Sequence, residues 1–223
     1  MTNTTVSNGK QWLDTFVFFL ESDKAPKAAV PIYLGSIPSE DIDYIYFNCE
    51  QLTRPSEQAT LLQRIRKRKP LELWDYSQIN TDIVRNHGLT ARYIHIQSPS
   101  WYTEKLVSYR TDIKYDVGFC GTVSPRRKRI LDRLIEKGVS VRLVNTWGDV
   151  RDKELAQCRI HINIHYGDDY KVFENARCEP WLAIGVPVVS ETSYDNDSRC
   201  INVDYDALVD TTLRVLISPT VSP

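Results

Sequence analysis

Short apolar runs alternate with amphipathic stretches along the whole chain. This pattern is typical of a mostly parallel sheet covered by helices. In the first half, the strands are expected at 15–20, 31–34, 44–48, 71–74 and 93–97, and the helices at 56–67 and 79–87. Ser77 and Gly88 flank the second helix, and their residue types favour a helix start and a helix end, respectively.

A polar stretch separates this region from a second alternation. Pro99 and the residues after it break the pattern, and no strand is predicted up to 114, so we place a domain junction at 98–114 and divide the chain into domains 1–104 and 105–223. The second domain is expected to contain strands at 115–120, 140–144, 159–165 and 186–190, and helices at 125–137, 150–157, 173–183 and 204–216, followed by a disordered end. The predicted fold class is α/β, with two Rossmann-like domains of which the N-terminal one is reduced.

Composition narrows the class of protein. With 42% hydrophobic and 26% charged residues, the 223-residue chain has the make-up of a globular protein. The formal net charge is -1, and the basic run from Arg64 to Lys69 is more typical of a solvated helix end than of a nucleic-acid site. We therefore predict no nucleic-acid partner.

Cysteine usage and the N-terminal residues bear on the cellular compartment. The 5 cysteines are widely spaced and include no C-x-x-C pair, which indicates reduced thiols in a cytosol rather than disulfides or a zinc site. No basic segment leads into an apolar one near the start, and the apolar run from Phe16 to Leu20 is too short to cross a bilayer. The sequence thus predicts a cytoplasmic protein without a membrane span.

A glycine loop is the most informative local element of the second domain. In VGFCGTVSPRRKR, a predicted strand leads into a turn at Gly121, and a helix is expected to begin with Ser124 as its cap and Pro125 as its first residue. Free backbone N–H groups at such a helix start, together with Arg126 and Arg127, would attract an anion such as a diphosphate. The alternative is a plain strand–loop–helix with solvated arginines, because the full G-x-G-x-x-G pattern is absent.

Polar and charged residues also gather before and within the helix expected at 173–183. They are Tyr170, Lys171, Glu174, Arg177 and Glu179. Glu174 and Arg177 are three positions apart and share a helix face, so they form either a surface salt bridge or, at the carboxyl edge of a parallel sheet, a site for a sugar hydroxyl and a phosphate. Glu191 ends the next predicted strand, where a carboxylate could accept both hydroxyls of a ribose.

Two further patterns could be taken for metal sites. His161 and His165 point to the same side of one predicted strand, but no third ligand has suitable spacing, so ordinary buried or cleft histidines are expected. Asp195 and Asp197 spell D-x-D in a polar loop late in the chain, which favours a turn over a cation site. No metal site is predicted.

Several motifs together resemble a known family. They are GFCGTVSPRR, the N-x-W-G of residues 145–148, HINIHY and FENARCE followed by GVPVVSE, with YFNCEQLT and LWDYSQIN in the first half. This set is similar to GT-B glycosyltransferases, in particular the small CgeB-like enzymes of bacteria and large DNA viruses. The resemblance covers most of residues 43–191 and implies two Rossmann-like domains facing a cleft.

The resemblance also implies how a nucleotide-sugar donor would be held. The residues near the phosphates would be Gly121, Thr122, Arg126 and Arg127, and those near the base would be Asn145 and Trp147. The residues near the sugar and the ribose would be Glu174, Arg177 and Glu191. Further candidates for the donor site are His165, Tyr170 and Lys171. Arginines and a helix dipole would stabilise the leaving diphosphate in place of a metal. No cofactor is expected, and the expected partners are the nucleotide-sugar and a glycan acceptor.

The first domain would supply the catalytic carboxylate. Glu50 and Asp75 follow predicted strands within the resembling motifs, and each is a candidate general base for the acceptor hydroxyl or a residue that orients a loop. Glu174 and Glu179 are only five positions apart, whereas many retaining relatives have glutamates eight apart, so the stereochemistry stays open. The expected function is sugar transfer; the alternatives are an inactive GT-B-like binding module and a Rossmann-like protein for another phosphorylated ligand.

Overall fold

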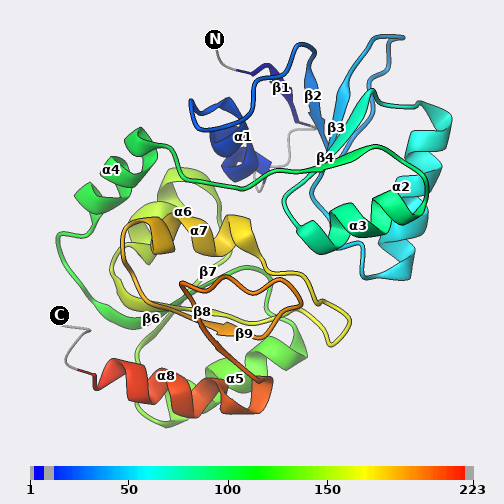
Figure 1. The fold of residues 1–223 in the computed structure, drawn as a ribbon. Helices are drawn as coiled ribbons and strands as arrows, with labels where there is room; N and C mark the ends of the chain where they lie inside the picture. Colours follow the sequence, from blue (N-terminus) through cyan, green and yellow to red (C-terminus); the bar gives the residue numbers. More distant parts are fainter. Residues whose placement is uncertain (1–2, 8–12, 219–223) are drawn as a thin grey trace. The chain divides into compact units, whose positions relative to one another are not determined.

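The computed structural model describes residues 3–7 and 13–218. The chain divides into two compact units (Figure 1). The first unit is Met1–Pro99 with Asp169–Val172, and the second unit is Ser100–Asp168 with Phe173–Pro223. The division predicted between residues 104 and 105 would fall inside helix α4 (Ser100–Tyr109).

The first unit is built on a five-stranded parallel sheet. Its strands are β1 (Thr5–Val6), β2 (Ile32–Leu34), β3 (Ile45–Asn48), β4 (Glu72–Asp75) and β5 (Ala91–Tyr93). They lie in the order β1-β2-β3-β4-β5, so neighbours in the sheet are also neighbours along the chain. The helices are α1 (Asp14–Glu21), α2 (Pro55–Lys67) and α3 (Gln78–Asn86).

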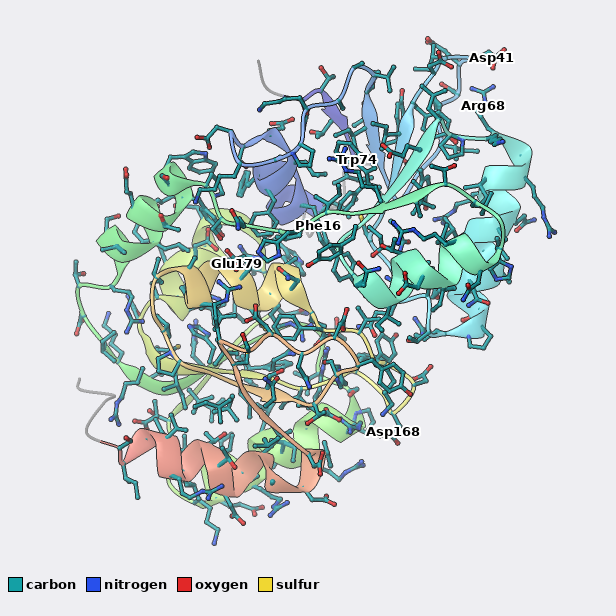
Figure 2. All side chains as sticks on the ribbon, viewed as in Figure 1. Phe16, Asp41, Arg68, Trp74, Asp168 and Glu179 are labelled. Carbon is teal, nitrogen blue, oxygen red and sulfur yellow. The ribbon has the colours of Figure 1, made fainter. Side chains whose placement is uncertain are left out.

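Helices cover both faces of this sheet. Phe16 of α1 packs with its ring centroid 5.4 Å from that of Phe47, on the face opposite α2 and α3 (Figures 1 and 2). On the other face, Tyr46 belongs to a buried cluster with Leu61 of α2 and Val84 of α3. Alternate residues of β3 therefore supply two separate apolar layers.

Residues 15–20, predicted as a strand, form helix α1 instead. The stretch TFVFFL is rich in aromatic and β-branched residues, which favour strands. Its buried apolar positions, however, are Phe16, Phe19 and Leu20, with Leu13 one turn earlier, and this spacing is helical. Tertiary burial of that face overrides the local strand preference.

The second unit contains a second parallel sheet with a different strand order. Its strands are β6 (Tyr115–Cys120), β7 (Val141–Val144), β8 (Cys158–Asn163), β9 (Val188–Glu191) and β10 (Ile201–Val203). The order is β10-β9-β8-β6-β7. The chain thus moves from β6 outward to β7 and then returns past β6 to β8, which creates a topological switch point between β6 and β8.

Helices cover both faces of the second sheet as well (Figure 1). These are α4, α5 (Pro125–Glu136), α6 (Gly148–Leu155), α7 (Asn175–Ala183) and α8 (Leu208–Leu216), the last preceded by the 3-10 helix η2 (Tyr205–Ala207). Apolar residues of β6, β8 and β9 form one core with α5 and α8. On the opposite face, Trp181 of α7 stacks on His161 of β8, with ring centroids 4.3 Å apart.

A short segment of the β8–α7 loop belongs to the first unit. The backbone N–H of Val172 donates to Oε1 of Gln51 at 3.0 Å. Nε of Arg54 lies 3.2 Å from Oδ2 of Asp169, and its guanidinium lies 4.3 Å from the ring centroid of Tyr170. Residues 169–172 are therefore held by the loop that follows β3.

The structure confirms the predicted α/β class with Rossmann-like topology. Most predicted strands and helices are found to within two residues at either end. The strand expected at 93–97 is instead β5, and β1, α4 and β10 were not predicted. The end expected to be disordered lies partly in 219–223, outside the described residues. Within the described part of the chain, every helix is too short or too polar to span a bilayer.

Candidate functional site

The candidate site lies at the carboxyl ends of β6 and β8. In open parallel sheets, ligands bind outside these ends where the strand order reverses. The loop after β6 begins at Gly121, and the loop after β8 leads to the first turn of α7. We call the group formed by Gly121, Asn163, His165, Glu174 and Arg177 the switch-point site.

Gly121 lets the loop after β6 approach a guanidinium closely. Its φ of 128° lies in a region that other residues avoid. A Cβ added there would lie 3.1 Å from Nη2 of Arg177. Glycine is therefore needed both for the backbone conformation and for the short approach to Arg177.

Arg177 is a charged group with hydrogen-bond donors to spare. Its Nη1 donates to Oδ1 of Asn163 at 2.9 Å and lies 2.7 Å from Oε2 of Glu174. Burial lowers the pKa of Arg177, but the charge of Glu174 and the hydrogen bond to it, together with two nearby cysteines, outweigh burial, so the pKa is raised. Within the described residues, its Nη2 and Nε make no hydrogen bond, and 20% of the side chain is exposed. Arg177 can thus bind an anion without giving up its present partners.

Arg127, predicted to bind phosphate, instead holds the surrounding loops. Its Nε donates to the carbonyl of Ile164 at 2.8 Å and its Nη1 to the carbonyl of Thr122 at 2.9 Å. The third nitrogen, Nη2, donates to Oε1 of Glu174 at 2.9 Å. The side chain is buried. Since all three nitrogens have partners, Arg127 joins the loops after β6 and β8 and fixes Glu174.

Arg126 and Glu191 are engaged with each other. The two guanidinium nitrogens Nη1 and Nη2 lie 2.6 and 2.5 Å from the two carboxylate oxygens. Nε lies 2.6 Å from Asp168 (Figure 2), and the guanidinium stacks 3.8 Å from the ring centroid of Tyr205. Glu191 also accepts the backbone N–H of His165. A phosphate or a ribose would have to open this bidentate pair to reach either residue.

His165 presents a buried ring nitrogen without a hydrogen bond, close to Glu174. His165 is fully buried, and its Nε2 lies 3.3 Å from the carbonyl of Thr192 and 3.2 Å from Oγ of Ser193. Its Nδ1 lies 3.8 Å from Oε2 of Glu174. Nδ1 has no hydrogen-bond partner among the described residues, whereas Oε2 lies 2.7 Å from Nη1 of Arg177.

The remaining predicted donor residues lie apart from this group. Asn145 is exposed after β7, and Trp147 precedes α6 with its ring centroid 5.5 Å from the Arg151 guanidinium. Tyr170 and Lys171 belong to the segment held by the first unit.

Asp75 holds the adjoining loops in place through hydrogen bonds to its carboxylate. Its carboxylate is fully buried and accepts hydrogen bonds from Nδ2 of Asn48 at 2.7 Å, Nδ2 of Asn80 at 3.1 Å and the backbone N–H of Ser77 at 2.8 Å. The carbonyl of Glu50 accepts from the same two amides. A buried carboxylate with three donors cannot reach an acceptor hydroxyl, which argues against Asp75 as general base.

Sequence reasoning missed three asparagines. Asn48 and Asn163 are each the last residue of a buried strand, and Asn80 lies in the first turn of α3. A buried asparagine at a strand end must find hydrogen-bond partners, so this position was the available signal. The partners themselves are distant in sequence.

The D-x-D residues form a turn, as predicted. Asp195 accepts the backbone N–H of Phe173, and Asp197 pairs with Arg199 at 2.6 Å. Arg199 also binds Glu179 of α7 (Figure 2). Residues 3–7 and 13–218 contain no group of three histidine, cysteine or acidic residues that could hold a metal ion.

Comparison with known proteins finds viral relatives. No family model and no solved structure matches the chain. Three proteins of Acanthamoeba polyphaga mimivirus, each described as uncharacterized, are similar at 36%, 35% and 31% identity over 84%, 81% and 83% of this chain. The chain spans 65% of the length of the first relative and 26% and 24% of the other two. These relatives leave the activity to be argued from the site.

Proposed function

We propose that the chain is a glycosyltransferase that moves a sugar from a nucleotide-sugar to a hydroxyl of a glycan or another acceptor, without a metal. The observation that carries the proposal is Arg177, which faces Gly121 at the switch point of the second sheet with unused donors. This position is where a parallel α/β unit binds a nucleotide.

The chemistry of sugar transfer asks for stabilisation of a leaving diphosphate. Arg177 supplies fixed positive charge, and α5 begins beside the same loop with Ser124 accepting the backbone N–H of Arg127 at 3.2 Å. The start of this helix adds a partial positive charge. Both are oriented before any ligand arrives, because Arg177 is fixed by Asn163 and Glu174.

The arrangement of two Rossmann-like units around a shared cleft is part of this proposal and rests on the resemblance to GT-B enzymes. The acceptor would enter from the first unit. With Asp75 buried, Glu50 is the predicted residue left for the role of general base.

Nucleotide binding is the first test. We expect one of UDP, GDP, CDP, dTDP or ADP to raise the unfolding midpoint selectively, and EDTA to leave the shift unchanged. A ligand at 100 times its Kd adds about 2.7 kcal/mol of stability. Titration calorimetry then gives the affinity, and the release of nucleoside diphosphate from a nucleotide-sugar gives the turnover.

Two variants make this test specific. Arg177→Ala should weaken nucleoside diphosphate binding about tenfold to a hundredfold, because it removes a charged hydrogen bond to phosphate. Arg129→Ala removes the same charge from an exposed position of α5 and should leave the affinity unchanged. Equal affinity in both variants, with the fold intact, would count against the proposal.

A donor-binding module without turnover is the second candidate. The burial of Asp75 favours it, because one of the two predicted bases is inaccessible. Binding of a nucleotide-sugar that depends on Arg177, with no release of nucleoside diphosphate in the presence of any acceptor, would select this candidate.

A further inference from the structure

An apolar pocket opens at the amino ends of β4 and β5 in the first unit. It is lined by the buried side chains of Ile65 and Leu73 and by the more exposed Leu71 and Leu89. Leu71 keeps 57% of its surface exposed at the edge of this pocket. The volume is about 60 Å³, roughly four water-sized positions, which is the size of one leucine side chain. We call it the amino-edge pocket.

A run of cations borders the amino-edge pocket. Residues 64–69 contain five arginines and lysines, and Lys69 lines the pocket itself. Lys67 and Lys69 also line a neighbouring polar hollow, in which Arg68 lies beside the loop that carries Asp41 (Figure 2). Cations in the last turn of α2 complement the helix dipole, as at any solvated helix end. Lys69, however, lies beyond the end of the helix and borders an apolar pocket, which the helix dipole does not explain.

The positive charge of this run is not neutralised within the described part of the protein. Arg64 and Arg68 donate to backbone carbonyls of the loop at 35–38, at 2.9 and 3.1 Å. Three further cations are exposed and form no ion pair with any described residue: Arg66, Lys67 and Lys69. By contrast, the first three basic residues of α5 each lie against a carboxylate. The end of α2 therefore has charge available for a partner.

Uncompensated positive charge beside an apolar pocket selects a partner that is both acidic and apolar. We propose that this end of the first unit binds an acidic peptide segment of a partner protein. One aliphatic side chain of the segment occupies the amino-edge pocket, and flanking carboxylates contact Lys67 and Lys69. The exposed ion pairs are individually weak, so the apolar side chain supplies the larger share of the affinity.

A peptide fits this surface better than a nucleic acid does. None of the described residues that line the pocket or the hollow is aromatic, so bases would find no ring to stack on. Asp41 and Asp43 also line the hollow and would repel a continuous phosphate backbone. A peptide can confine its negative charges to the residues beside the apolar side chain. Since the switch-point site belongs to the second unit, this inference does not rest on the proposed function.

Selection from a random peptide library displayed on phage, with the full chain immobilised, tests the inference without a known partner. We expect the selected peptides to share one aliphatic residue flanked by aspartate or glutamate. Fluorescence polarisation of one labelled peptide from this selection then gives its affinity for the wild type and for variants. Serine in place of the aliphatic residue of the peptide should weaken binding about tenfold.

Two charge-reversed variants form a matched pair. Lys67→Glu combined with Lys69→Glu should weaken peptide binding about tenfold, because attraction is replaced by repulsion. Arg133→Glu combined with Lys137→Glu makes the same change of charge at the exposed end of α5 and should leave the affinity unchanged. Leu71→Ser should weaken binding about threefold, since only part of the pocket is lost. All five positions are exposed, and unfolding midpoints verify that the variants fold.

Three outcomes would overturn the inference. Selected peptides without the acidic and aliphatic pattern would show that the surface does not recognise such a segment. Equal weakening in the two charge-reversed variants would show that acidic peptides are attracted without a specific site. Binding of a labelled oligothymidylate that is lost with Lys67→Glu and Lys69→Glu, while no peptide is selected, would assign the run to nucleic acid. Because none of these experiments involves a nucleoside diphosphate, the proposed function stands or falls separately.

Discussion

The carboxyl edges of the two parallel sheets contain the same kinds of residues but differ in how far their polar atoms are satisfied by hydrogen bonds. In the first unit, Asn48, Asp75 and Asn80 satisfy one another and the adjoining loops. In the second unit, Arg177 keeps unused donors and His165 keeps an unsatisfied acceptor. One edge is closed by its own hydrogen bonds, and the other has capacity left for a ligand.

Strand order explains part of this difference. The first sheet runs β1-β2-β3-β4-β5 without a reversal, so successive loops lie next to one another and can be tied together. The second sheet reverses between β6 and β8, so the loops on either side diverge and leave a crevice. The motifs YFNCEQLT and LWDYSQIN, which suggested catalysis, lie on the closed edge. Motifs at the end of a strand therefore have to be judged together with the topology around them.

The largest change in stability is expected from a substitution at the closed edge of the first sheet. Asp75→Ala leaves three buried donors unsatisfied, from Asn48, Asn80 and Ser77, and should lower the free energy of unfolding by about 3–5 kcal/mol in chemical denaturation. Asp82→Ala, at an exposed position of α3, is the control and should have little effect. If Asp75→Ala were as stable as the control and yet lost turnover, Asp75 would be a base after all.

Acidification should weaken the second sheet specifically. His161 is buried against Trp181, and burial lowers the pKa of His161 to about 3, against 6.5 when exposed. Because the unfolded chain binds the proton more readily, stability falls as the pH drops below 6.5, by about 2 kcal/mol at pH 5. No strand of the first sheet carries a histidine.

Denaturation at several pH values measures this effect. His161→Phe keeps an aromatic ring at this position and removes the proton site, so the slope between pH 6.5 and 5 should flatten. His87→Phe, at an exposed position after α3, should leave the slope unchanged. The same slope in all three proteins would assign the acid sensitivity to other groups.

A substitution in the glycine loop tests the open edge. Gly121→Ala would place a Cβ 3.1 Å from Nη2 of Arg177 and strain a backbone with φ of 128°. Gly185→Ala also places alanine at a positive φ, 76°, but has open space around it. Each should cost about 1–2 kcal/mol of stability, and only Gly121→Ala should also weaken nucleoside diphosphate binding, by about tenfold in calorimetry. Equal affinities would mean that Gly121 serves the turn alone.

The smallest changes in stability are expected at two helix caps, one from each unit. Ser77 accepts the backbone N–H of Asn80 in α3, and Ser124 accepts that of Arg127 in α5. Alanine at either position should cost about 1 kcal/mol. Ser124 also donates to the carbonyl of Tyr166, so Ser124→Ala should cost a few tenths of a kcal/mol beyond the loss of the cap alone in urea denaturation. If Ser124→Ala lowers the free energy of unfolding by no more than the loss of a cap, the loop after β8 is held by other contacts.

Local signals in the sequence were enough for most elements of the fold. The start of α5 was predictable because Ser124 and Pro125 act within one turn. Helix α1 was not, because its strand-like composition conceals a helical pattern of burial. Helix α4 buries only Tyr102 and Leu106, too few positions to produce a clear period, and β10 is only 3 residues long.

The site was predictable only where its contacts are local. The spacing of Glu174 and Arg177 indicated a shared helix face, and the two side chains do form an ion pair at 2.7 Å. The second partner of Glu174 is Arg127, 47 residues away, and nothing in the local pattern marks that contact. The same holds for Arg126 and Glu191, 65 residues apart. Long-range pairing decides which arginine is left for a ligand.

The four residues from Asp169 to Val172 make the chain cross between the units three times instead of once. Neither half of the chain is therefore a self-contained unit that could be transferred to another protein by a single cut. A gene fusion or truncation cut after Pro99 would carry this segment away from Gln51 and Arg54, the residues that hold it. Any exchange of the second unit between related proteins would have to carry along the loop that follows β3, so we expect the two stretches to be inherited together.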